Sequence, residues 1–136
     1  EIFGRQLIYD CQDQICGTIP NLLINSTEIS FEGLWELVRS FDGVMFPAHI
    51  DKSSTSLLSS LGMIPPDSKF TTAGVKDLKR LHQLKREHPY LEQCRIISNS
   101  DAHYLEHIHE PELTLLAEEK SAEAVIQTLL TPLLPG

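Results

Sequence analysis

Residues 96–105 read IISNSDAHYL, a short apolar strand followed at once by side chains that can bind a metal. Asp101 and His103 are two positions apart, so in an extended chain they project from the same side. A carboxylate oxygen and an imidazole nitrogen suit Zn, Mn or Fe better than Ca. A polar turn after a buried strand also commonly contains Ser, Asp and His, because these side chains cap and solvate it. The ten residues alone leave a metal site and a plain turn as equal alternatives.

A second apolar stretch, residues 44–48 (VMFPA), also ends at side chains that can bind a metal or carry charge. Its continuous apolar character predicts a strand buried on both faces of a parallel sheet. His49, Asp51 and Lys52 follow it. Open α/β sheets and α/β barrels hold their sites at the carboxyl ends of strands, so we expect both clusters to face one mouth. The repetition favours a metal site over a plain turn.

The remaining elements predict a single α/β domain without internal repeats. Turn signals and apolar spacing predict further strands at residues 5–10 and 13–17, as a hairpin, and at 70–75 and 113–116. They predict helices at residues 31–40, 53–61, 76–87 and 121–130. Within the domain of residues 1–136 we expect a peripheral hairpin at 1–20, β/α units at 21–131 and a tail at 132–136.

The composition and net charge indicate which cellular compartment and which classes of partner to expect. Hydrophobic residues make up 41% and charged residues 22%, which is ordinary for a globular protein. No apolar run approaches the roughly 18 residues of a membrane span, and no basic-then-apolar leader is present, so we expect a cytoplasmic protein without a membrane partner. The three cysteines lack CxxC spacing and predict reduced thiols. A net charge of −8 opposes binding to a nucleic-acid backbone unless a local basic patch or metal ions intervene.

Two motifs together resemble the polymerase and histidinol phosphatase (PHP) family of metal-dependent phosphoesterases. Residues 46–52 (FPAHIDK) resemble the family's Pro-Ala-His segment, and residues 100–105 (SDAHYL) resemble its Ser-Asp-Ala-His segment. Residues 61–65 (LGMIP), between them, resemble a subgroup of stand-alone bacterial PHP proteins. The order and separation of the segments also fit, and the similarity covers nearly the whole chain.

The resemblance implies a fold, cofactors and site residues. It implies an α/β chain that forms the C-terminal half of a distorted seven-stranded β/α barrel of PHP type. It also implies two or three divalent metal ions (Zn, Mn or Fe) in the intact protein, with His49, Asp101 and His103 as metal ligands. The family's N-terminal His-x-His motif has no counterpart in this sequence. We therefore expect the fragment alone to be inactive and to require a missing N-terminal half or to self-associate.

The expected activity of the intact protein is hydrolysis of a phosphate ester, on a phosphorylated small molecule, by metal-activated water. Lys52 is a candidate to contact a phosphate oxygen, with a plain surface position as its alternative, and Asp51 is a candidate to orient a ligand or water. The alternative function is a non-catalytic PHP-like scaffold or regulatory module, because the remaining ligands are absent. A nuclease or polymerase-associated PHP domain ranks lower, since the chain offers neither aromatic stacking platforms nor a basic channel.

Overall fold

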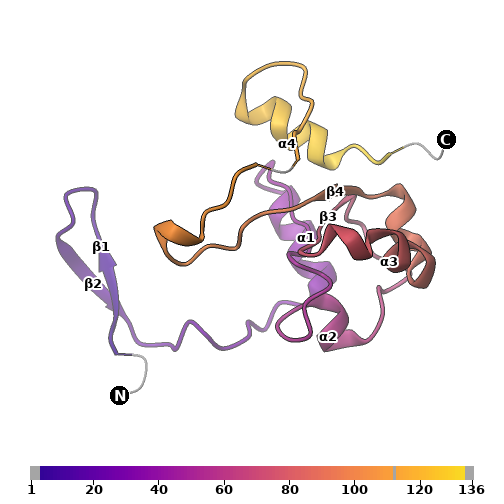
Figure 1. Cartoon of the computed structure of the whole chain (residues 1–136). Coiled ribbons are helices and arrows are strands. Elements are labelled where there is room, and N and C mark those ends of the chain that lie inside the picture. Colours follow the sequence, from indigo (N-terminus) through magenta and orange to yellow (C-terminus); the bar gives the residue numbers. More distant parts are fainter. Residues whose placement is uncertain (1–3, 112, 134–136) are drawn as a thin grey trace. The chain divides into compact units, whose positions relative to one another are not determined.

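The computed structural model describes residues 4–111 and 113–133, and these divide between Ser30 and Phe31 into two compact units (Figure 1). The first unit is a hairpin in which β1 (Gln6–Tyr9) pairs antiparallel with β2 (Ile15–Ile19). Its turn is held by the Asp10 carboxylate, which accepts hydrogen bonds of 2.9 Å from the backbone N–H groups of Gln12 and Gln14. The sequence predicted a hairpin here, and the structure has one.

The second unit is built around three segments that run in the same direction. β3 (Thr72–Gly74) pairs in parallel with β4 (Arg95–Ile97). On the other edge of β3, the Gly74 N–H donates to Pro47 O at 2.8 Å, and Gly74 O accepts from the Ile50 N–H at 2.8 Å. Residues 47–50 therefore run beside β3, and the carboxyl ends of all three segments meet at one edge.

An extra residue interrupts the pairing beside Gly74. A regular parallel ladder leaves one residue between the two partners of Gly74, but Ala48 and His49 both lie between Pro47 and Ile50. A Cβ added to Gly74 would lie 3.0 Å from His49 N, tighter than an ordinary contact, so glycine favours this close approach. The predicted strand at residues 44–48 is wrong, because this bulge leaves no regular ladder for these residues to join.

Four α-helices form near the predicted stretches: α1 (Phe31–Arg39), α2 (Leu57–Leu61), α3 (Leu81–Glu87) and α4 (Ala122–Leu130). α2 begins later than expected because Ser56 caps it. The Ser56 hydroxyl accepts from Ser59 N–H at 3.1 Å, and the Ser59 hydroxyl accepts from Ser56 N–H at 2.9 Å. The helix predicted at residues 76–87 starts as a 3-10 turn, Leu78–Arg80, before α3 begins.

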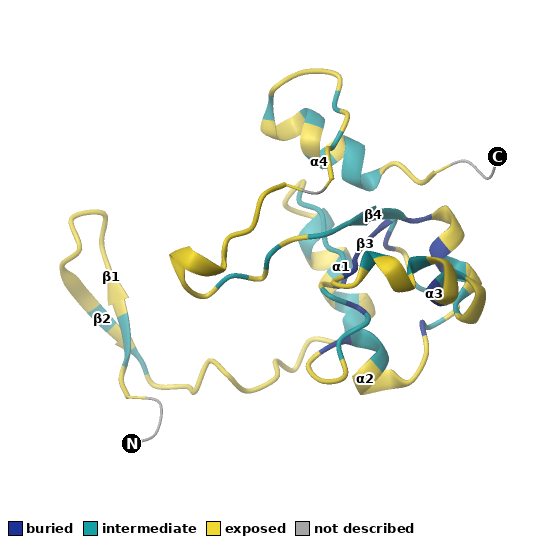
Figure 2. Ribbon diagram, in the orientation of Figure 1, coloured by how far each residue is buried: buried dark blue, intermediate teal, exposed yellow. Residues whose placement is uncertain are grey.

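The hydrophobic core of the second unit surrounds β3 and the start of β4 (Figure 2). Phe70 is 1% exposed, and its ring packs edge-on against Phe31 and tilted against Tyr90, with centroids 6.2 and 4.9 Å away. The other buried apolar residues of this core are Ile50, Ile64, Ala73, Val75, Leu84, Leu91 and Cys94. The core thus fixes the segments that lead to the common carboxyl edge.

The last carbonyls of α4 are bonded to the start of the sheet. The hydroxyls of Thr71 and Thr72 each donate to Leu129 O at 2.7 Å, and Arg95 Nε donates to Thr128 O at 3.1 Å. These donors bond carbonyls of the last helical turn, of which Thr128 O also accepts from the Thr131 N–H at 3.4 Å, and the Arg95 charge suits the negative end of the helix dipole. α4 is therefore fixed at the end of β3 and β4 opposite to the edge where the three segments terminate.

The expected half of a seven-stranded β/α barrel is not present. The described residues form two sheets of two strands each, and neither sheet closes into a barrel. Residues 113–116, predicted as a strand, form none in the described chain, although residues 113–115 line a cavity with β4. Leu116 is 86% exposed, so this apolar run lacks a second layer to bury it. The TIM-like barrel is thus a wrong prediction, because apolar runs alone do not specify strand pairing.

Candidate functional site

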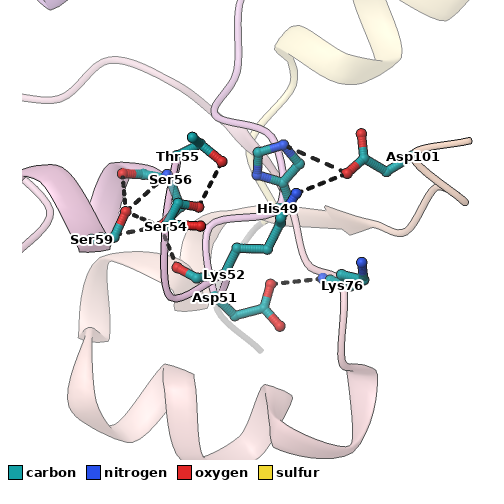
Figure 3. Close-up of polar contacts among 9 residues, drawn as sticks. All are labelled: His49, Asp51, Lys52, Ser54, Thr55, Ser56, Ser59, Lys76 and Asp101. Carbon is teal, nitrogen blue, oxygen red and sulfur yellow. Dashed lines mark hydrogen bonds and ion pairs between the residues drawn. The ribbon is translucent and has the colours of Figure 1, made fainter. Parts of the chain in front are cut away.

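His49 and Asp101 come together from the carboxyl ends of two parallel segments (Figure 3). His49 Nε2 lies 4.0 Å from Asp101 Oδ2. Lys52 Nζ donates a hydrogen bond of 3.1 Å to the same Asp101 oxygen. The imidazole of His49 and the ammonium of Lys52 therefore both lie close to one oxygen of the Asp101 carboxylate.

The backbone at both His49 and Asp101 adopts the left-handed conformation, with φ of 33° and 52°. This conformation is uncommon for residues other than glycine and costs roughly 1–3 kcal/mol, though less for Asp. Asp13, Asp42 and Thr55 also have positive φ, so the conformation alone does not mark a site. What is particular to His49 and Asp101 is that two such residues, far apart in sequence, face one another.

Lys52 is the cation that lies closest to the Asp101 carboxylate among the ion pairs of this residue in the described chain. Its hydrogen bond is the main cause that lowers the pKa of Asp101, and the charges of Lys52, His49 and His103 act in the same direction. Partial desolvation opposes them without reversing the shift. An ionised Asp101 is the form that can bind a cation.

A cavity of about 180 Å³ opens beside the pair at the common carboxyl edge. Its lining residues are Phe46, Ala48, His49, Gly74, Val75, Lys76, Asn99 and Asp101. The volume exceeds the roughly 30 Å³ of one water and is below the roughly 300 Å³ at which pockets for drug-sized ligands begin. The cavity can therefore hold an ion with a few waters, or a group the size of a phosphate.

Lys76 and Asn99 line this cavity, although sequence reasoning did not select them. Lys76 follows the end of β3, and Asn99 follows the end of β4. The rule that ligands bind at the carboxyl ends of parallel strands could have identified both, had it been applied to β3 as well. Asn99 lies in the same stretch, residues 96–105, as Asp101 and His103.

His103 does not join the pair in a common metal-binding group. It is exposed and lines a separate surface hollow with Ala102, Tyr104, Leu105, Glu106 and Ile108. The left-handed turn at Asp101 ends the extended geometry from which we expected Asp101 and His103 to project together.

Asp51 also points away from the pair. Its carboxylate accepts hydrogen bonds from the backbone N–H groups of Lys76 at 2.7 Å and Asp77 at 2.8 Å. Burial acts to raise the pKa of Asp51, but these bonds outweigh it and lower the pKa overall. Asp51 therefore fixes the loop after β3, which carries Lys76 to the cavity.

An imidazole nitrogen from His49 and a carboxylate oxygen from Asp101 are suitable ligand atoms for a divalent cation. The distance between these two atoms fits a shared ion only after a small movement. Two ligand atoms bound to one zinc ion lie about 3.4 Å apart across a tetrahedral angle, which is shorter than the observed 4.0 Å. His49 Nδ1 is buried without a hydrogen-bond partner, whereas a ligating histidine usually donates its second N–H. Two candidate ligand atoms are therefore present, and their supporting contacts are incomplete.

The predicted metal cluster is not formed within the part of the chain that the structure describes. No three His, Cys, Asp or Glu side chains there are placed to hold a metal together. The reason is local, because the turn at Asp101 separates it from His103. Any metal at His49 and Asp101 would need further ligands from water, from a bound anion or from another polypeptide segment.

Comparisons with protein-family models, with characterised proteins and with solved structures found no match. The resemblance to the PHP family therefore rests on the motifs at residues 46–52 and 100–105. Among the described helices, none has the length and apolar character needed to cross a membrane.

Proposed function

We propose that this chain carries one part of a PHP-like, metal-dependent phosphoester hydrolase site, in which His49 and Asp101 are ligands of a divalent ion. The observation that supports the proposal is the approach of an imidazole and an ionised carboxylate to 4.0 Å beside a cavity of phosphate size. Both residues lie in the segments whose motifs resemble PHP phosphoesterases. Zn, Mn and Fe accept this combination of nitrogen and oxygen ligands.

In this proposal, different residues of the chain have different roles in binding the ion and the substrate. His49 offers an imidazole nitrogen, and Asp101 offers a carboxylate oxygen whose pKa is lowered by the hydrogen bond from Lys52. A divalent ion, when bound, lowers the pKa of a coordinated water and stabilises charge on phosphate oxygens. Lys76 and Asn99 line the cavity, where an ammonium and an amide N–H can bind oxygens of a phosphorylated small molecule.

A non-catalytic scaffold is the second candidate, and one observation favours it. The described residues supply only two ligands, and Lys52 already neutralises Asp101 at 3.1 Å. In this alternative the contacts among His49, Lys52 and Asp101 join two strand ends without a metal. Metal binding therefore decides between the candidates.

The test is a titration of the purified protein with Mn²⁺ or Zn²⁺, by competition with a chromogenic chelator. We expect His49→Ala and Asp101→Asn to lose metal binding, because each removes one of two ligands. Exposed residues outside the site provide matched controls, His82→Ala and Asp67→Asn, which should bind as the wild type does. Metal binding that is unchanged in both site variants would refute the ligand assignment.

Hydrolysis is measured separately on the protein at its natural length, with p-nitrophenyl phosphate and Mn²⁺. We expect hydrolysis that requires His49 and Asp101 and is abolished by EDTA. Stoichiometric metal binding with no hydrolysis of phosphate esters would favour the scaffold.

A further inference from the structure

Lys52 places a positive charge next to the oxygen that a metal at His49 would have to share. Its Nζ lies 3.1 Å from Asp101 Oδ2, the same atom that lies 4.0 Å from His49 Nε2 (Figure 3). The side chains of Lys52 and Asp101 are only 29% and 31% exposed. A divalent ion bound to both His49 and Asp101 would therefore meet the ammonium of Lys52 at close range.

The backbone of Lys52 is fixed, so this contact is more than the chance position of a surface lysine. The Lys52 N–H donates to His49 O at 3.0 Å, and the Ser56 hydroxyl donates to Lys52 O at 2.7 Å. Ser56 is 5% exposed and caps α2. The turn from His49 to Ser56 thus aims Lys52 at the carboxylate.

We propose that Lys52 is an internal cation that competes with the divalent metal for Asp101. This inference rests on the proposed function. Two cations at one carboxylate oxygen repel each other, so metal binding at Asp101 Oδ2 favours displacement of the ammonium. Lys52 is then released from Asp101, a residue that lines the neighbouring cavity. Metal binding and the release of a positive charge beside the cavity are thereby coupled in one side chain.

The chain contains a matched control for this ion pair. Lys85 lies 3.3 Å from Glu92, and its side chain is 24% exposed, close to the exposure of Lys52. No histidine is among the partners found for this pair in the described residues. Lys85→Met therefore removes the same charge from an ion pair outside the candidate site, whose Glu92 side chain is 62% exposed against 31% for Asp101.

The experiment compares Mn²⁺ affinity in the wild type, Lys52→Met, Lys52→Arg and Lys85→Met. We expect Lys52→Met to bind Mn²⁺ about 1.5- to fivefold tighter, the range that loss of a partly exposed ion pair produces. Lys52→Arg keeps the competing charge and should bind as the wild type does, as should Lys85→Met. A merely structural role for Lys52 would lower stability without raising metal affinity.

The outcomes separate the inference from the function on which it rests. If the wild type binds Mn²⁺ and Lys52→Met binds it with equal or lower affinity, the proposed competition by Lys52 is overturned. The assignment of His49 and Asp101 as metal ligands is then unaffected. Mn²⁺ binding in Lys52→Met alone would support the competition by Lys52 and the metal site. Absence of Mn²⁺ binding in every variant would overturn the competition and the metal site together.

A second measurement on the wild type covers the case in which Lys52→Met fails to fold. Lysine acylation is followed by mass spectrometry with and without saturating Mn²⁺. We expect Lys52 to react several-fold faster with Mn²⁺ present, because its ion pair is broken, while Lys85 reacts at the same rate in both conditions. Equal rates at Lys52 in a sample that binds Mn²⁺ would overturn the inference.

Discussion

Two aspartates of the same region show how partners decide the role of a residue. Asp101 has one oxygen near His49 and Lys52, both of which are side chains that can exchange for other partners. Asp51 instead accepts bonds from two backbone N–H groups, which stay fixed as long as the loop is folded. We infer that Asp101 serves binding and Asp51 serves stability, although both follow an apolar stretch in the sequence.

Replacing Asp51 by Ala should lower the free energy of unfolding by about 1–3 kcal/mol, because two backbone donors lose their acceptor. The folded-state pKa of Asp51 is lowered, so its stabilisation is complete above the unfolded value of about 3.9 and is lost as pH falls through the folded value. Urea unfolding of wild type and Asp51→Ala at pH 7, 4 and 2.5 measures this. A difference that stays constant down to pH 2.5 would show that the charge of Asp51 contributes nothing.

At the scale of elements, the bulge beside β3 links the fold to the candidate site. The extra residue between Pro47 and Ile50 gives His49 its left-handed backbone and turns its imidazole toward Asp101. A Cβ at Gly74 would crowd the backbone of this bulge. The short strand β3 therefore holds the site through its backbone, while its neighbours supply the side chains.

Gly74→Ala should destabilise the second unit by about 1–3 kcal/mol. The new Cβ would lie 3.0 Å from His49 N and 3.2 Å from Ala48 Cα, and neither is the end of a flexible side chain. Relief requires the segment that carries His49 to move, so Mn²⁺ affinity should fall as well. Urea unfolding and the Mn²⁺ titration together measure both effects. A variant with wild-type stability and affinity would show that the bulge adapts freely.

Local sequence patterns predicted elements better than they predicted how elements pair. The apolar spacing of α2 and α4 predicted both helices because it depends on residues within a few positions, although the start of α2 at its Ser56 cap was not predicted. The meeting of His49 and Asp101 was expected from a rule about strand ends, and the structure brings them together. The barrel was not predictable in this way, since strand pairing at residues 44–48 and 113–116 depends on partners far along the chain.

The reactivity of the fully buried Cys94 measures how readily the core of the second unit opens. It lies in the core at the start of β4, and burial raises the pKa of its thiol to about 11. Because the thiolate is the reactive form, Cys94 should react with iodoacetamide at pH 8 at least about 100-fold more slowly than an ordinary exposed thiol. Labelling of Cys94 then requires the core to open.

The two exposed cysteines of the hairpin, Cys11 and Cys16, serve as internal controls for this measurement. We expect mass spectrometry to find them labelled first in native buffer, and all three thiols to react at similar rates in concentrated urea. The Cys94 rate at intermediate urea reports the free energy of opening the core, since reaction follows the population of the open form. Rapid labelling of Cys94 in native buffer would mean that the core opens readily without denaturant. The carboxyl edge that holds His49 and Asp101 would then be only transiently formed.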